Sequence, residues 1–105
     1  MADYTFKLTE GGTQLLITIG ATKFDASCVS EFKQRLDETW QDTIIHVDID
    51  FSQVDFIDSS GIGALLGVQK KLRGDGQPIR VLNAKPNVVS VIELLRLHRV
   101  FSITD

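Results

Sequence analysis

Apolar and polar side chains alternate along the first twenty residues of the chain. Residues 4–9 read Tyr-Thr-Phe-Lys-Leu-Thr, and residues 14–19 are rich in β-branched and apolar side chains. A two-residue period is typical of a strand that buries one face. Residues 10–13 include two glycines, which favour a turn. The sequence therefore predicts an opening β-hairpin.

The next segment has a helical period. Between residues 26 and 39 the apolar side chains recur every three to four residues, as expected for an amphipathic helix. The stripe consists of Val29, Phe32, Leu36 and Trp40. Asp25 precedes the helix, and its side-chain oxygen can accept a hydrogen bond from an unpaired helical amide. We therefore expect Asp25 to be the N-cap.

Strand and helix patterns alternate in the remaining sequence. We expect a strand over 43–51, a helix over about 60–72 stopped by Gly74-Asp75-Gly76, a short strand over 78–82 and a helix over about 86–97. Residues 101–103 add a short strand or an extended tail. The order β-β-α-β-α-β-α, with this optional last strand, predicts an α/β fold. It is a single domain over residues 1–105, with helices packed on a mixed sheet.

The strand predicted over residues 43–51 has one unexpected face. Its apolar face carries Ile45, Val47, Ile49 and Phe51. The opposite face carries His46, Asp48 and Asp50, and is more polar than a strand buried on both sides should be. The sequence pattern gives no reason for this polarity.

Composition narrows the class of protein. A chain of 105 residues can form one core without metal or disulfide support. The net charge of −3 argues weakly against nucleic-acid or anionic-membrane binding, although a local basic patch is compatible with it. Cys28 is the one cysteine, which fits a reducing cytosol. The N-terminus lacks a signal-peptide pattern, and no apolar run approaches the ~20 residues that span a bilayer. We expect a soluble, cytoplasmic protein with no membrane or direct nucleic-acid partner.

Residues 58–63, Asp-Ser-Ser-Gly-Ile-Gly, are the strongest candidate site. They place a carboxylate and two hydroxyls where a strand and its loop give way to a helix. Ser59 is either a plain helix N-cap or a site of modification. Asp58 either competes for the cap or orients the hydroxyl. Gly61 and Gly63 keep the helix start free of bulk, so another protein's backbone could come close.

A helical projection of residues 60–72 separates two sides. The side expected to pack on the sheet carries Ile62, Leu65, Leu66, Gln69 and Leu72. The side expected to face outward carries Gly63, Ala64, Gly67, Val68 and Lys71. Because glycines inside a helix cost roughly 1 kcal/mol each relative to alanine, this smooth side indicates close approach by another molecule. The alternative is that the last helix of the chain packs over it.

The stretch Phe56-Ile57-Asp58-Ser59-Ser60-Gly61-Ile62-Gly63, followed by Ala64-Leu65-Leu66, closely resembles the signature of STAS domains of the anti-sigma-factor-antagonist type. The order of the predicted elements is similar too, so the resemblance covers essentially the whole chain. It implies a non-enzymatic partner switch. The unphosphorylated protein binds a serine-kinase anti-sigma factor and frees the sigma factor. The kinase inactivates the antagonist by phosphorylating a serine, and a PP2C-type phosphatase reverses this.

In that family the modified hydroxyl directly follows the aspartate, which maps onto Ser59, with Ser60 as the alternative acceptor. The residues we expect to bind the partner are Asp58, Ser60, Gly61, Ile62, Gly63, Ala64, Gly67 and Val68. Many members carry Gly-x-x-Asp before the first helix, whereas Gly20 and Asp25 are more widely spaced here. The resemblance therefore does not imply that Asp25 contacts a kinase. The expectation that Asp25 caps the first helix does not depend on the resemblance.

Two alternative functions remain. A small enzyme or nucleotide-binding domain would use Asp58 and Ser59, but the sequence shows no base paired with the serine and no oxyanion donors. His46 and His98 have no third ligand at metal spacing, so we expect no metal and no cofactor. A STAS scaffold subunit without a kinase, for example in a stressosome or a lipid-transport complex, fits the same sequence.

Overall fold

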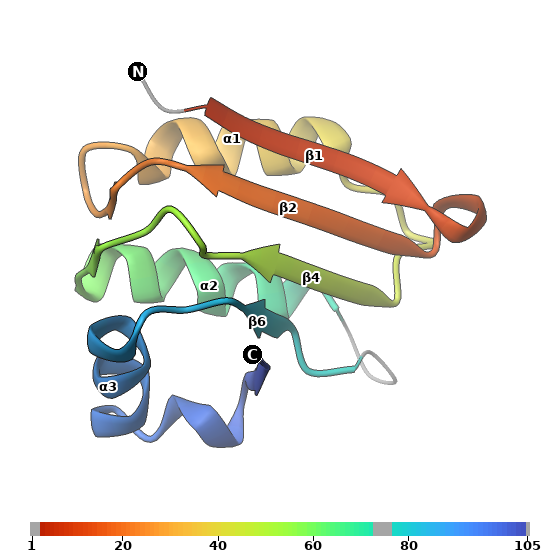
Figure 1. Cartoon of the computed structure of the whole chain (residues 1–105). Coiled ribbons are helices and arrows are strands. Elements are labelled where there is room, and N and C mark those ends of the chain that lie inside the picture. The colour runs from red at the N-terminus through yellow and green to blue at the C-terminus, as the bar shows by residue number, and fades with distance from the viewer. Residues whose placement is uncertain (1–2, 73–76, 105) are drawn as a thin grey trace.

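A five-stranded mixed sheet lies at the centre of the fold (Figure 1). The computed structural model describes residues 3–72 and 77–104, and the sheet order within them is β1-β2-β4-β6-β7. These strands are β1 (Asp3–Thr9), β2 (Gln14–Gly20), β4 (His46–Asp50), β6 (Arg80–Leu82) and β7 (Ser102–Thr104). β1 and β2 are antiparallel, and the other neighbours are parallel. The predicted hairpin, mixed sheet and last strand are confirmed.

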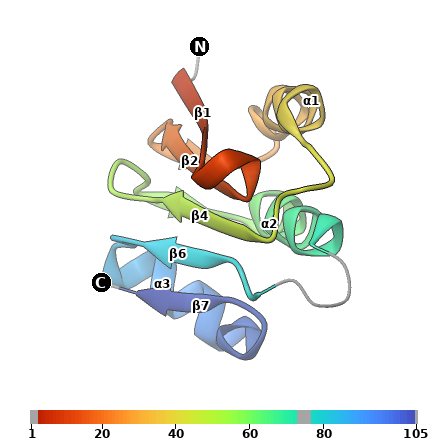
Figure 2. The same ribbon diagram turned by 90° about the vertical axis from the view of Figure 1, so that its right-hand side faces the viewer.

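Helices connect the parallel strands. α1 (Val29–Thr39) follows β2 in the chain, α2 (Ser59–Lys71) follows β4, and α3 (Pro86–Leu94) follows β6. Figure 2 shows α1 and α2 on the same side of the sheet. The glycine stop predicted at residues 74–76 lies outside the described residues.

The core lies between the sheet and these two helices. Alternate residues of the central strands are at most 1% exposed: Leu15, Ile17, Ile19, Val47 and Ile49. Phe32 of α1 packs its ring against Tyr4, Phe6 and Phe24, with centroid distances of 5.6, 5.8 and 5.1 Å. Aromatic side chains bury large areas, so this cluster anchors α1 to the sheet. The predicted hydrophobic stripe of α1 is confirmed.

The start of α1 differs from the prediction. The helix begins at Val29, not at residue 26, and its N-cap is Cys28, which makes no side-chain capping bond. The Asp25 carboxylate instead accepts hydrogen bonds from the amide and hydroxyl of Ser27. The bond from the Ser27 hydroxyl lowers the pKa of the Asp25 carboxyl below its ordinary value. Asp25 therefore stabilises the turn before the helix and is not its N-cap.

A second, two-stranded sheet was not predicted. β3 (Lys23–Phe24) pairs in parallel with β5 (Phe56–Ile57), and no strand was predicted at either segment. Two-residue strands are too short to show an alternating pattern. This small sheet leads directly into α2.

The third predicted strand begins later than expected. β4 starts at His46, and Ile45, expected on the apolar face, is 48% exposed, whereas Ile44 is 4% exposed. The amides of Ile45 and His46 both donate to the carbonyl oxygen of Thr13, at 2.8 and 3.1 Å. In a regular strand, consecutive amides point in opposite directions, so two consecutive amides cannot donate to one oxygen. The alternation of buried and exposed side chains therefore begins only after His46.

The polar face of β4 is explained by its partners. Val47 and Ile49 point into the core, so Asp48 points to the opposite face of the sheet. Asp48 is only 7% exposed, and its carboxylate lies 3.1 Å from Nε of Arg80 on β6. Its second oxygen accepts a hydrogen bond of 3.1 Å from the side-chain amide of Gln14 on β2. Neighbouring strands therefore neutralise and satisfy this carboxylate.

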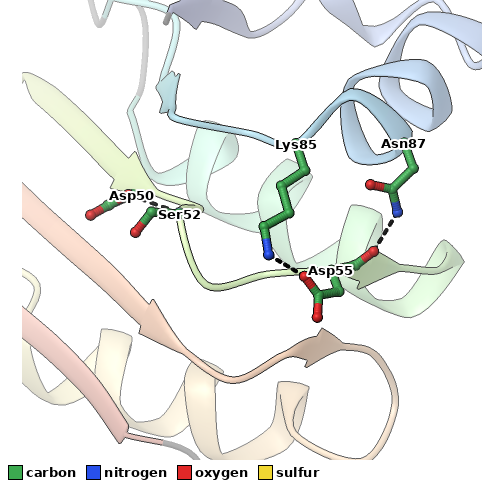
Figure 3. A network of polar contacts seen from close by, with 5 residues as sticks. All are labelled: Asp50, Ser52, Asp55, Lys85 and Asn87. Atoms are coloured by element: carbon green, nitrogen blue, oxygen red, sulfur yellow. Dashed lines mark hydrogen bonds and ion pairs between the residues drawn. The ribbon is translucent and has the colours of Figure 1, made fainter.

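The other two polar residues of β4 are more accessible to solvent. His46 is exposed and Asp50 is partly buried. The Asp50 carboxylate accepts a hydrogen bond of 2.9 Å from the Ser52 amide, which turns the chain out of the strand (Figure 3). The polarity of this face therefore follows from partial exposure to water together with local pairing.

We expect Arg80→Met to destabilise the fold by about 1–2 kcal/mol, because it leaves a nearly buried carboxylate without its cation. Urea unfolding followed by circular dichroism measures the change. Lys85→Met is the matched control, since it breaks an ion pair whose side chains are 42% and 59% exposed and should cost less than about 0.5 kcal/mol. Equal losses in the two variants would contradict this account of the polar face.

Candidate functional site

The predicted acceptor motif lies at the start of α2. Asp58 is the N-cap of this helix, and its Oδ1 accepts hydrogen bonds from the amides of Ser60 and Gly61, at 2.9 and 3.1 Å. Ser59 is therefore the first helical residue and not the cap. Asp58 therefore has the capping role, which is one of the two roles left open for it.

The two serines differ in accessibility. Ser59 is exposed, whereas Ser60 is partly buried. The first turn of α2 contains no acidic residue, and a helix N-terminus carries a partial positive charge. A phosphate on Ser59 would therefore lie at a favourable end of the helix dipole.

Gly61 has a packing role. A Cβ atom placed on it would lie 2.1 Å from the backbone oxygen of Phe24 and 2.8 Å from a side-chain carbon of Ile57. The first turn of α2 therefore rests against the β3–β5 sheet. The expectation that Gly61 leaves room for another protein was wrong, because its own fold fills that space.

The predicted faces of α2 need correction. Ala64 and Val68 were expected to face outward, but they are 1% and 0% exposed. Ile62 was expected to pack on the sheet, and it is buried, with 5% exposure. Leu66 was expected on the sheet and is 36% exposed. α1 packs against part of the side that was expected to face outward, while Gly63 and Gly67 on that side stay open. Lys71, on that side, forms an ion pair of 2.7 Å with Asp37 of α1. The alternative that the last helix of the chain covers it is wrong too, because α1 takes that place.

The true outward face of α2 is a shallow depression of about 500 Å³, which we call the α2 groove. It is lined by Gly63, Leu66, Gly67, Gln69 and Lys70. A Cβ atom on Gly63 or Gly67 would meet nothing within 4 Å. Of the residues expected to bind a partner, Gly63 and Gly67 thus line this groove, which also contains Leu66 and Lys70, two residues that were not on that list. The sequence did not indicate the true outward face of α2, because a helical projection does not show where α1 packs.

Asp55 anchors the loop before β5 through its backbone and its side chain (Figure 3). Its amide donates to the carbonyl oxygen of Thr22 at 2.7 Å. Its carbonyl oxygen accepts from the side chain of Asn87, and its carboxylate pairs with Lys85, both at the start of α3. The ion pair also neutralises one of the acidic charges close in sequence to Ser59. Phe56, the next residue, is 46% exposed and adds an apolar side chain to this surface.

The described residues hold neither a metal-binding cluster nor a membrane-spanning helix. Within 3–72 and 77–104, no three His, Cys, Asp or Glu side chains come together in a way that could hold a metal ion. No helix in these ranges is long and apolar enough to cross a bilayer.

Residues 8–105 match the family model of the STAS domain, and the chain belongs to this family. Its fold is similar to that of the Bacillus anti-sigma factor antagonist SpoIIAA in the unphosphorylated form, with a TM-score of 0.74 and 18% identity over 98% of this chain and 88% of that chain. An anti-sigma-factor antagonist STAS protein from Planctomyces limnophilus gives a TM-score of 0.79 and 20% identity over 100% and 91%. A murine solute carrier 26 anion transporter gives 0.68 and 22% over 86% of this chain but 15% of the transporter.

We expect Gly61→Ala to destabilise the fold by about 1–3 kcal/mol, because the new methyl group collides with backbone atoms. Gly63→Ala is the matched control two residues away. It fills open space in a helix and should leave stability unchanged or raise it by up to about 1 kcal/mol. Thermal or urea unfolding distinguishes the two, and a neutral Gly61→Ala would contradict the close packing of α2 on β3.

Proposed function

We propose that the protein is an anti-sigma-factor antagonist controlled by phosphorylation. In its unphosphorylated form it binds a serine-kinase anti-sigma factor in the cytoplasm, and the sigma factor is released. Phosphorylation of Ser59 blocks this binding, and a PP2C-type phosphatase restores it. The observation that carries the proposal is the exposed Ser59 at the capped N-terminus of a helix whose outward face is the α2 groove.

Ser59 is favoured over Ser60 as the acceptor because its side chain is the accessible one. The Asp58 carboxylate already holds two backbone amides, so it is poorly placed to act as a base on a substrate. The serine is therefore a target for another enzyme's chemistry, and we expect no catalysis by the chain itself.

The α2 groove is the docking surface in this proposal. Two glycines without side chains allow a partner to approach the helix backbone at Gly63 and Gly67. Leu66 supplies an exposed apolar anchor and Lys70 a cation at the rim. The buried residues once expected to touch the partner, Ala64 and Val68, keep α2 in position instead.

A single phosphate is sufficient to control such a complex. A phosphoserine carries about −1.5 to −2 charges at pH 7. A like charge on the partner roughly 6 Å away would cost on the order of 1–3 kcal/mol at a moderate effective dielectric. Because about 1.4 kcal/mol changes affinity tenfold, this repulsion weakens binding by about ten- to a hundredfold. SpoIIAA, which shares the fold, has been solved in unphosphorylated and phosphorylated forms, and this supports the comparison.

The first test is phosphorylation in vitro. We expect incubation with the host's serine-kinase anti-sigma factors and ATP to add one phosphate, located on Ser59 by peptide mass spectrometry. Ser59→Ala should abolish the modification, and Ser60→Ala should retain it. Phosphate found only on Ser60 would contradict the assignment. No phosphate with any such kinase would favour a scaffold role for the STAS domain.

The second test concerns the groove. We expect Leu66→Glu or Gly67→Gln to weaken binding of the unphosphorylated protein to its kinase partner at least about tenfold, because each introduces a bulky or charged side chain into the contact. Isothermal titration calorimetry measures the affinity. Ile45→Glu is the control, since Ile45 is also an exposed apolar residue but lies before β4. Unchanged affinity in both groove variants would place the partner elsewhere on the surface.

A further inference from the structure

The end of α3 exposes apolar side chains beside cations. Leu94 is 82% exposed, Leu95 50% and Val100 36%. Arg96 and Arg99 are exposed in the same segment and form no ion pair with residues 3–72 or 77–104. We call residues 94–100 the α3 tip. A leucine this exposed contributes little to the core, so the apolar character of the tip points to an interaction outside the chain.

The backbone of the tip is also unusual. The helix predicted to reach residue 97 ends at Leu94, and a 3-10 turn follows over Leu97–Arg99. Between them Arg96 has φ 60° and ψ 24°, the left-handed conformation. Helices commonly end with glycine in this conformation, and a side chain there carries a steric cost. The chain thus places an arginine at a position where glycine would be more stable.

Charge is unevenly distributed along the chain. Residues 77–104 hold four basic residues and one acidic residue, a net charge of +3, whereas residues 3–72 hold six basic and eleven acidic residues, a net charge of −5. Lys85 and Arg80 are paired with aspartates, which leaves the two arginines of the tip as the unpaired cations of residues 77–104. Together with the exposed Glu93 just before the tip, these two arginines give residues 93–100 a net charge of +1, opposite in sign to the whole chain.

We infer that the α3 tip binds the surface of an anionic membrane. Leu94, Leu95 and Val100 enter the headgroup region, and the two arginines contact lipid phosphates. Protruding apolar side chains with flanking cations favour peripheral binding to an anionic membrane.

A membrane fits the tip better than a second protein does. The exposure of Leu94 shows that it stands out from the surface and does not line a groove. A stable protein interface buries about 800 Å² on each partner, which is more than three apolar side chains supply. A lipid surface needs no complementary shape, so a small patch suffices. Figure 1 shows the turn after α3 at the outer edge of the molecule, beyond β6, whereas α2 lies behind β4. Membrane binding through the tip therefore leaves α2 accessible.

The test is co-sedimentation of the whole chain with vesicles, and it does not involve Ser59. We expect binding to phosphatidylcholine vesicles that contain phosphatidylglycerol, loss of that binding in high salt, and little binding to phosphatidylcholine alone. Leu94→Ser with Leu95→Ser should abolish the binding. Ile45→Ser, which removes an apolar side chain that is 48% exposed, close to the 50% of Leu95, should leave it unchanged.

The Arg96→Gly variant distinguishes a loss of vesicle binding from a loss of folding stability. It relieves the left-handed backbone, so the melting temperature should rise, while vesicle affinity should fall about fivefold through loss of one cation. Lys33→Ala is the matched control for charge. Absence of binding to both vesicle types, equal binding to both, or full binding by the double serine variant would each overturn the inference. So would a concentration-dependent dimer, or binding of the kinase partner, that Leu94→Ser abolishes, because the tip would then be a protein interface.

Discussion

The close contact between the first turn of α2 and β3 is the constraint on which the candidate site depends. No side chain fits at Gly61, because its Cβ position lies 2.1 Å from a backbone oxygen of Phe24. This contact, together with the Asp58 cap, fixes the helix start at Ser59. Ser59 consequently faces solvent while the residues after it pack inward. The α2 groove, one turn further along the helix, is positioned by the same contact.

Local patterns predicted most of the fold, and tertiary contacts account for what they missed. The hairpin, the order of the main-sheet strands and the three helices, and the start of a helix near residue 60 were correct, because alternation, helical period and turn residues are local signals. The faces of α2 were partly wrong because Ala64 and Val68 are buried on the side where α1 packs. The role of Asp25 was wrong because Ser27 captures its carboxylate. The buried carboxylate of Asp48 could not be explained from the sequence, because its partners Arg80 and Gln14 come from neighbouring strands.

The structure separates two surfaces of different chemistry. Around α2, an exposed serine at a helix N-terminus lies beside a smooth groove, and Asp55 anchors the preceding loop to the start of α3. At the other end of α3, leucines and unpaired arginines form the tip. A small domain with these two surfaces can bind a regulatory partner through one and a charged surface through the other. Neither function requires a catalytic centre.

The central claim is that charge at Ser59 controls partner binding. The most direct measurement compares the affinity of the cognate serine-kinase anti-sigma factor for three forms of the protein: unmodified, carrying phosphoserine at position 59, and carrying phosphoserine at position 60. We expect phosphoserine at 59 to raise Kd by about ten- to a hundredfold while the fold stays intact. An unchanged Kd for that form, or a loss of affinity only when position 60 is modified, would contradict this claim.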